Sequence, residues 1–201
     1  MILYHCSPTP GLRVLEPRVT PYFDKPRQLC LTELRPMALF YGIRHFEYTY
    51  GYTRAGELYY MEQFPGALAE LYGGKSASLY LCEEREDLET TAIPHERVTT
   101  RPVPVREEIL IPDLLAALRE QERQGTVRLV PWEQVDEANR RWIVDAERWE
   151  ILDRGLLDRP EESIACFLRE KYPESWALAR KEREKQTPSD TTRSEKNESA
   201  Q

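Results

Sequence analysis

Apolar and aromatic residues gather into short runs in the first half of the chain, each five to nine residues long and bounded by turn formers. Runs of this length and composition are typical of buried strands. The predicted strands are residues 1–6, 28–32, 57–63, 78–82 and 103–111. Tyr48, Tyr50 and Tyr52 alternate with smaller residues and also favour a strand or hairpin. Residues 83–96 are polar and acidic and predict a loop or a weak hairpin.

The second half of the chain changes to a helical period. Leu114, Leu115 and Leu118 lie on one face of a predicted helix that Gly125 can end. Three further helices are predicted at residues 132–154, 161–171 and 174–184. Tryptophans stand at helical spacings in this half and are expected to anchor it: Trp132, Trp142, Trp149 and Trp176. Because strands precede helices instead of alternating with them, the pattern predicts an α+β fold with small mixed or antiparallel sheets, followed by a helical half.

This change of period suggests three parts. We expect residues 1–111 to form an α+β domain and residues 112–185 to form a helical extension that packs on it. Residues 186–201 contain no aromatic or large aliphatic side chain, so they cannot form a core and are predicted to be disordered.

Composition restricts the class of protein. The 201 residues carry a net charge of −7, so no strong affinity for nucleic acid is expected. No apolar run is long enough to cross a membrane, and the first residues lack the pattern of a secretory signal. The four cysteines form no CxxC pair and the three histidines stand in no zinc-ligand spacing. We therefore expect a soluble cytoplasmic protein with reduced thiols and no metal.

Residues with chemical potential follow one another in a distinctive order. The strand Leu3-Tyr4-His5-Cys6-Ser7 is followed by a proline-rich loop, and then by the strand 29–32. Thr32 can cap a helix that runs to about Arg44 and contains Ala38-Leu39-Phe40-Tyr41. This order resembles the N-terminal half of ADP-ribosyltransferase-like proteins of the His-Tyr-Glu type, whose first strand commonly reads LYHGS and whose helix carries Ala-x-x-Tyr.

The resemblance implies a protein that binds NAD and transfers ADP-ribose to an acceptor, either a protein or a nucleic acid, that the sequence does not name. By resemblance, His5 donates a hydrogen bond to a ribose hydroxyl and Tyr41 stacks on the nicotinamide ring. Glu108, on the strand 103–111, takes the place of the carboxylate that stabilises positive charge at the anomeric carbon.

Other residues complete the expected cofactor site. Arg18 suits the pyrophosphate, because its guanidinium fork matches phosphate oxygens. Tyr4, Ser7 and Thr32 are the remaining candidates for cofactor binding. Cys6 stands where the family usually has glycine, and a side chain there would narrow the pocket.

Several alternatives remain open from the residues alone. Glu83, Glu84 and Glu107 compete with Glu108, and only one residue of the adjacent pair Glu107-Glu108 can face a cleft. His5 and Tyr41 can also be ordinary structural residues, in which case another tyrosine would stack.

The chain departs from the family pattern before the late carboxylate. Arg106 occupies the position where the family often has Glu or Gln, so arginine-directed transfer is not expected. This departure favours a second hypothesis, in which the fold is a catalytically degenerate interaction module. Phosphate transfer on RNA ends, which uses a related fold, is a third hypothesis, and the acidic, histidine-poor composition argues against it.

Overall fold

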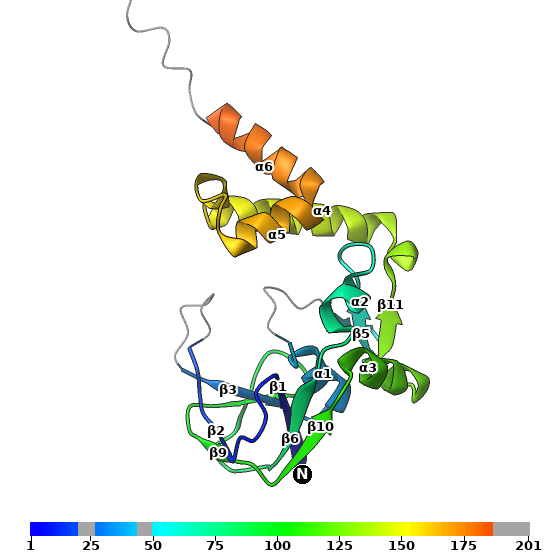
Figure 1. Ribbon diagram of the computed structural model, residues 1–201, viewed down its shortest axis with the longest axis vertical. Coiled ribbons are helices and arrows are strands. Elements are labelled where there is room, and N and C mark those ends of the chain that lie inside the picture. The colour runs from blue at the N-terminus through cyan, green and yellow to red at the C-terminus, as the bar shows by residue number, and fades with distance from the viewer. Residues whose placement is uncertain (20–26, 44–49, 187–201) are drawn as a thin grey trace, which may run out of the picture. The chain divides into compact units, whose positions relative to one another are not determined.

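The computed structural model describes residues 1–19, 27–43 and 50–186 (Figure 1). The chain divides into two compact units, Met1–Val135 and Asp136–Gln201. This boundary differs from the one predicted after residue 111, because the segment from 112 to 135 packs within the first unit. Of the tail predicted to be disordered, Gln186 ends the last helix and the remainder lies outside the described residues.

The first unit is built on a six-stranded sheet in the order β10-β6-β1-β3-β8-β7, in which every neighbouring pair is antiparallel. Its strands are β1 (Ile2–Ser7), β3 (Leu29–Thr32), β6 (Ala77–Glu83), β7 (Glu89–Thr90), β8 (Glu96–Thr99) and β10 (Glu107–Ile111). The N-terminal strand β1 therefore lies inside the sheet, and β10 and β7, which come from later in the sequence, form its two edges. The predicted α+β class with antiparallel sheets is confirmed.

Two smaller sheets complete the strands. The strand β5 (Leu58–Met61) pairs antiparallel with β4 (Tyr50–Tyr52) and parallel with β11 (Arg128–Val130). The strand β2 (Val14–Leu15) pairs with β9 (Val103–Pro104). The single strand predicted at 103–111 is therefore two strands, because its first residues pair with β2 and its later ones with β6.

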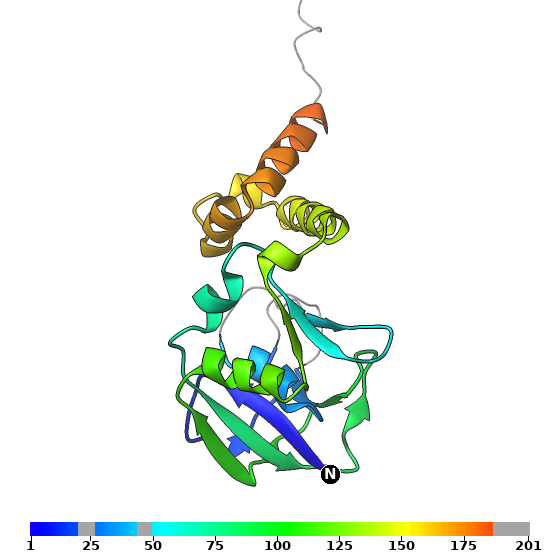
Figure 2. The same ribbon diagram turned by 90° about the vertical axis from the view of Figure 1, so that its right-hand side faces the viewer.

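Helices cover one face of the six-stranded sheet. They are α1 (Arg35–Phe40), α2 (Ala67–Tyr72) and α3 (Leu114–Arg123), and Figure 2 shows α1 and α3 against the sheet. Cys6 and Leu79 of the sheet form one buried cluster with Phe40, Leu114 and Leu118 of these helices. A fully buried residue of a core is worth a few kcal/mol, so α3 is a structural part of this unit.

The opposite face of the sheet has its own apolar cluster. Leu3, Tyr80 and Cys82 lie there with Leu15 of β2 and Val103 of β9. Successive residues of a strand point to opposite faces, so Leu3 enters one cluster and Cys6 the other. Both faces of β1 are therefore covered. We call the face that packs against α1 and α3 the helix face, and the face that packs against β2 and β9 the β2–β9 face.

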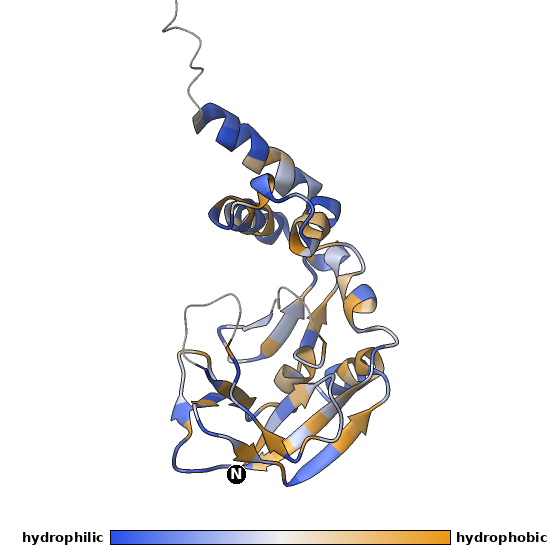
Figure 3. Ribbon diagram, turned by 60° about the vertical axis from the view of Figure 1, so that its left-hand side comes forward, coloured by the Kyte–Doolittle hydropathy of each residue, from blue (hydrophilic) through white to orange (hydrophobic). Residues whose placement is uncertain are grey.

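The second unit is helical and is described here by itself. It contains α4 (Glu137–Asp153), the 3₁₀ turn η2 (Leu156–Asp158), α5 (Ser163–Lys171) and α6 (Pro173–Gln186). The helix predicted at 132–154 is instead a 3₁₀ turn, η1 (Trp132–Gln134), and α4, since the Asp136 carboxylate accepts a hydrogen bond from the Asn139 amide and caps α4 there. The end of α6 is strongly hydrophilic (Figure 3).

Only one of the three tryptophans of the second unit is buried in its core. Ile143 and Ile151 take the inward face of α4, and Trp176 is buried on α6. Trp142 and Trp149, predicted to anchor the helices, are instead 54% and 61% exposed. Their spacing of seven residues places both on the outward side of α4.

Candidate functional site

His5 lies on the β2–β9 face of β1, where β1 and β3 begin to separate. The two strands pair at Tyr4 and Thr32, and the His5 side chain then reaches the Cys30 carbonyl with Nδ1 at 3.0 Å. A carbonyl oxygen only accepts, so Nδ1 carries the hydrogen. Burial lowers the pKa of His5 below its usual 6.5, and the charge of Arg18 lowers it further. The imidazole is therefore neutral at pH 7, with Nε2 as a hydrogen-bond acceptor.

This tautomer changes the role expected for His5. The resemblance suggested that the ring donates a hydrogen bond to a ribose hydroxyl. With its only hydrogen directed to the Cys30 carbonyl, the ring can offer a hydroxyl the lone pair of Nε2 instead.

Cys6 does not narrow the space around His5. It points to the helix face, is 2% exposed, and would lie 3.0 Å from a Cβ placed on Gly42. Burial raises the pKa of its thiol to about 12, so it is an inert core residue.

Glu108 shares the β2–β9 face with His5, since both are in register with Tyr80 on the strand between them. Its Oε1 accepts hydrogen bonds from the Gly11 amide at 2.8 Å and from the Ser78 hydroxyl at 2.7 Å. The fully buried Tyr80 stands between Glu108 and His5, and its hydroxyl donates to the Thr9 carbonyl at 2.6 Å. Glu108 therefore holds the loop that follows β1 rather than facing His5 across an opening.

The bond from Gly11, followed by that from Ser78, lowers the pKa of Glu108 below 4.5. A lowered folded-state pKa stabilises the fold above pH 4.5, and this stabilisation disappears as the pH falls through the lowered value. We therefore expect the exchange protection of the Gly11 amide to be complete at neutral pH and to disappear in acid. NMR hydrogen exchange from pH 7 to pH 3 measures it.

Glu108→Gln should reduce that protection several-fold at pH 7 and remove its dependence on pH. The neighbouring Glu107→Gln is the matched control, because Glu107 is exposed and points to the opposite face of the sheet from Glu108. Protection of Gly11 that is equal in the wild type and in Glu108→Gln would show that the carboxylate does not hold the loop.

Tyr41, Tyr50 and Tyr52 gather on the helix face. Tyr41 ends α1, and its hydroxyl lies 2.8 Å from that of Tyr50 on β4, with the two rings edge to face. Burial, the contact with Tyr50 and the charge of Glu96 raise the pKa of Tyr41 well above its usual 10. Burial first, and then the charges of Tyr50, Glu96 and Glu33, raise the pKa of Tyr52 to about 12.

Glu96 is the carboxylate that these tyrosines share. It begins β8, is 8% exposed, and pairs directly with Thr32. Residues directly opposite one another in an antiparallel pair point to the same face. Thr32 contacts Met37 of α1, with 3.1 Å between Oγ1 and Sδ, so Glu96 also points to the helix face. Because Glu96 is buried and its charge raises the pKa values of all three tyrosines, it is a candidate functional residue.

The sequence did not single out Glu96, because it ends the polar stretch 83–96, which was predicted to be a loop or a weak hairpin and in which no functional residue was expected. The signal that could have found it is the alternation that begins there, Glu-Arg-Val-Thr, which indicates a strand with every second residue facing inward.

The remaining predicted residues fall into two groups. Ser7 and Thr32 are 7% and 4% exposed, and their hydroxyls accept the Thr9 and Leu34 amides, so both serve local structure. Tyr4 is half-buried against the helix-face cluster, and Arg18 is exposed, with its backbone paired to Gln28.

The competing carboxylates lie elsewhere. Glu84 lies 3.6 Å from the N-terminal amine, and Glu107 is exposed at the start of β10. The structure therefore brings Tyr41 together with Tyr50 and Glu96, and brings His5 together with Arg18. Tyr41 and Glu108 lie on opposite faces of the sheet.

Comparison with protein-family models, curated proteins and solved structures gives no match for this chain. Within the described ranges, no group of three or more His, Cys, Asp or Glu side chains is arranged to hold a metal ion. None of the helices there combines the length and apolarity needed to cross a bilayer.

Proposed function

We propose that the first unit is ADP-ribosyltransferase-like, that it binds NAD, and that it transfers ADP-ribose to a protein or nucleic-acid acceptor. The observation that supports this most is the buried Glu96 beside the Tyr41–Tyr50 pair, in a chain that opens with the order Leu3-Tyr4-His5-Cys6-Ser7. In this proposal Glu96 replaces Glu108 as the carboxylate of the site.

The proposed roles follow from the chemistry of the nicotinamide–ribose bond. That bond breaks through an oxocarbenium-like state, and a nearby negative charge stabilises it. Glu96 supplies that charge and a ring of the Tyr41–Tyr50 pair stacks on nicotinamide. His5 lies on the opposite face of the sheet, so this proposal assigns it no contact with that ribose. Nicotinamide leaves with the bonding electrons, and the acceptor nucleophile attacks the anomeric carbon and releases a proton. The exposed Arg18 binds the pyrophosphate.

Calorimetric titration with NAD tests the proposal. We expect the wild type to bind NAD and Tyr41→Ala to bind it several-fold more weakly, because a ring that stacks on nicotinamide is lost. His5→Ala changes a side chain on the opposite face of the sheet and should leave the affinity unchanged. Circular dichroism of each variant controls for folding. A wild type that does not bind NAD, or an unchanged affinity in a folded Tyr41→Ala, would exclude this function.

One observation favours the second candidate, a catalytically degenerate interaction module of the same fold. The carboxylate expected from the resemblance, Glu108, is committed to the Gly11 amide and the Ser78 hydroxyl. Absence of NAD hydrolysis, together with a protein that co-purifies in fixed stoichiometry, would select this candidate.

A further inference from the structure

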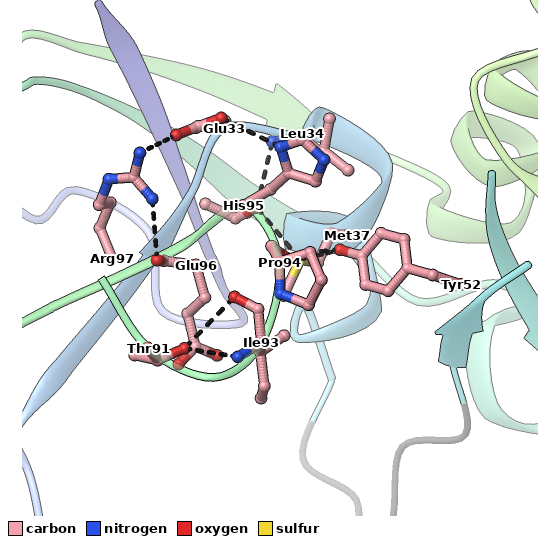
Figure 4. A network of polar contacts seen from close by, with 11 residues as sticks. Glu33, Leu34, Met37, Tyr52, Thr91, Ile93, Pro94, His95, Glu96 and Arg97 are labelled. Atoms are coloured by element: carbon pink, nitrogen blue, oxygen red, sulfur yellow. Dashed lines mark hydrogen bonds and ion pairs between the residues drawn. The ribbon is translucent and has the colours of Figure 1, made fainter. Parts of the chain in front are cut away.

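One carboxylate holds both chain neighbours of Glu96 (Figure 4). Glu33, between β3 and α1, accepts the Nδ1 hydrogen of His95 on Oε2 at 3.0 Å and pairs with Arg97 through Oε1. Its backbone amide also donates to the His95 carbonyl at 3.0 Å. Arg97 in turn donates to the Glu96 carbonyl at 3.1 Å. Glu33 therefore holds His95 and Arg97, the residues on either side of Glu96.

The backbone before Glu96 adopts a conformation that needs such support. His95 has a φ of 63°, and it is the one non-glycine residue with positive φ in the described part of the chain. A side chain is strained in this region, and such a residue persists where its surroundings hold it. Tyr52 supports the same turn from β4, because its hydroxyl donates to the Pro94 carbonyl at 2.9 Å.

The alternation of a strand then fixes the direction of Glu96. Arg97, the next residue of β8, points to Glu33, so Glu96 points to the other face of the sheet. Thr32, the neighbour of Glu33, likewise points to the helix face, where it pairs with Glu96.

We propose that Glu33 is a positioning residue, which directs the Glu96 carboxylate toward Tyr41 and Tyr50 by holding His95 and Arg97. The expected effect of Glu33 on the affinity for NAD rests on the proposed function. Its expected effect on the NMR signals of Tyr41 and Tyr50 does not. Held in this way, Glu96 presents its charge without having to reorganise when a ligand arrives.

NMR of the full chain with ¹³Cζ-labelled tyrosine tests the proposal directly. The charge of Glu96 raises the pKa values of Tyr41, Tyr50 and Tyr52, whereas the charge of Glu33 raises that of Tyr52 and is not a cause for Tyr41 or Tyr50. Glu96→Gln defines the signals of Tyr41 and Tyr50 without that charge. We expect Glu33→Gln to move both signals toward these positions, although it leaves Glu96 in the chain.

Two further variants make the test decisive. Glu89→Gln removes an exposed carboxylate from β7, the strand beside β8, and should leave the tyrosine signals unchanged. His95→Gly removes the imidazole contact with Glu33 and also relieves the strained φ, because glycine tolerates positive φ. This variant should therefore fold, and it serves as the test if Glu33→Gln unfolds. It should also move the signals of Tyr41 and Tyr50.

The same samples separate this inference from the proposed function. If NAD binds to the wild type, Glu33→Gln should weaken it several-fold and Glu89→Gln should not. If NAD does not bind, the proposed function fails, but the tyrosine signals still test the role of Glu33. Wild-type signals in both Glu33→Gln and His95→Gly would overturn the inference, whatever NAD does.

Discussion

Glu96→Gln is expected to slow the release of nicotinamide from NAD by about 10²–10³-fold, which is the typical effect of removing one preorganised group that stabilises transition-state charge. The affinity for NAD should change by only a few-fold, because the carboxylate acts when positive charge develops on the ribose and not before. Nicotinamide release in single turnover gives the rate, and calorimetry gives the affinity.

Glu108→Gln is the matched comparison, because it removes the carboxylate that the resemblance pointed to. Its Oε1 is already engaged by Gly11 and Ser78, so we expect a smaller loss of rate and a loosened loop. If Glu108→Gln abolishes the reaction and Glu96→Gln does not, the carboxylate of the site is Glu108 after all.

Leu114→Ala is expected to destabilise the first unit by about 2–5 kcal/mol, the usual cost of truncating a buried leucine and leaving a cavity. Leu114 is fully buried on α3, and its side chain lies 2.9 Å from the position a Cβ would take on Gly42. Little space remains for neighbours to collapse into the hole. Denaturant-dependent amide exchange in β1 and β6 measures the stability of this unit separately from that of the second unit.

Leu110→Ala is the control for this prediction. It removes the same atoms from a leucine that is 68% exposed on β10, so the stability should change by less than about 0.5 kcal/mol. If Leu114→Ala left exchange in β1 and β6 unchanged and weakened the helices beyond Val135 instead, the boundary after residue 111 would be the right one.

The sequence by itself determined the elements that depend on local patterns. The run 78–82 predicts a buried strand, because a short apolar run is removed from water on folding, and this run forms most of β6. The spacing of Leu114, Leu115 and Leu118 predicts α3, and the structure shows that Asp113 caps its first turn. Together with the separation of strands from helices along the chain, these patterns were enough to predict the α+β class.

The tertiary structure alone decided which of these residues meet. Glu108 is engaged by an amide 97 residues away, and Glu96 becomes a partner of the tyrosines only because β8 lies beside β3 in the sheet. Trp142 and Trp149 fit the apolar stripe of a helix, yet Ile143 and Ile151 take the inward side. The spacing of hydrophobic residues determines structure over a few residues, so it can be read from the sequence. Strand order and register involve the whole unit, and they determine which side chains become neighbours.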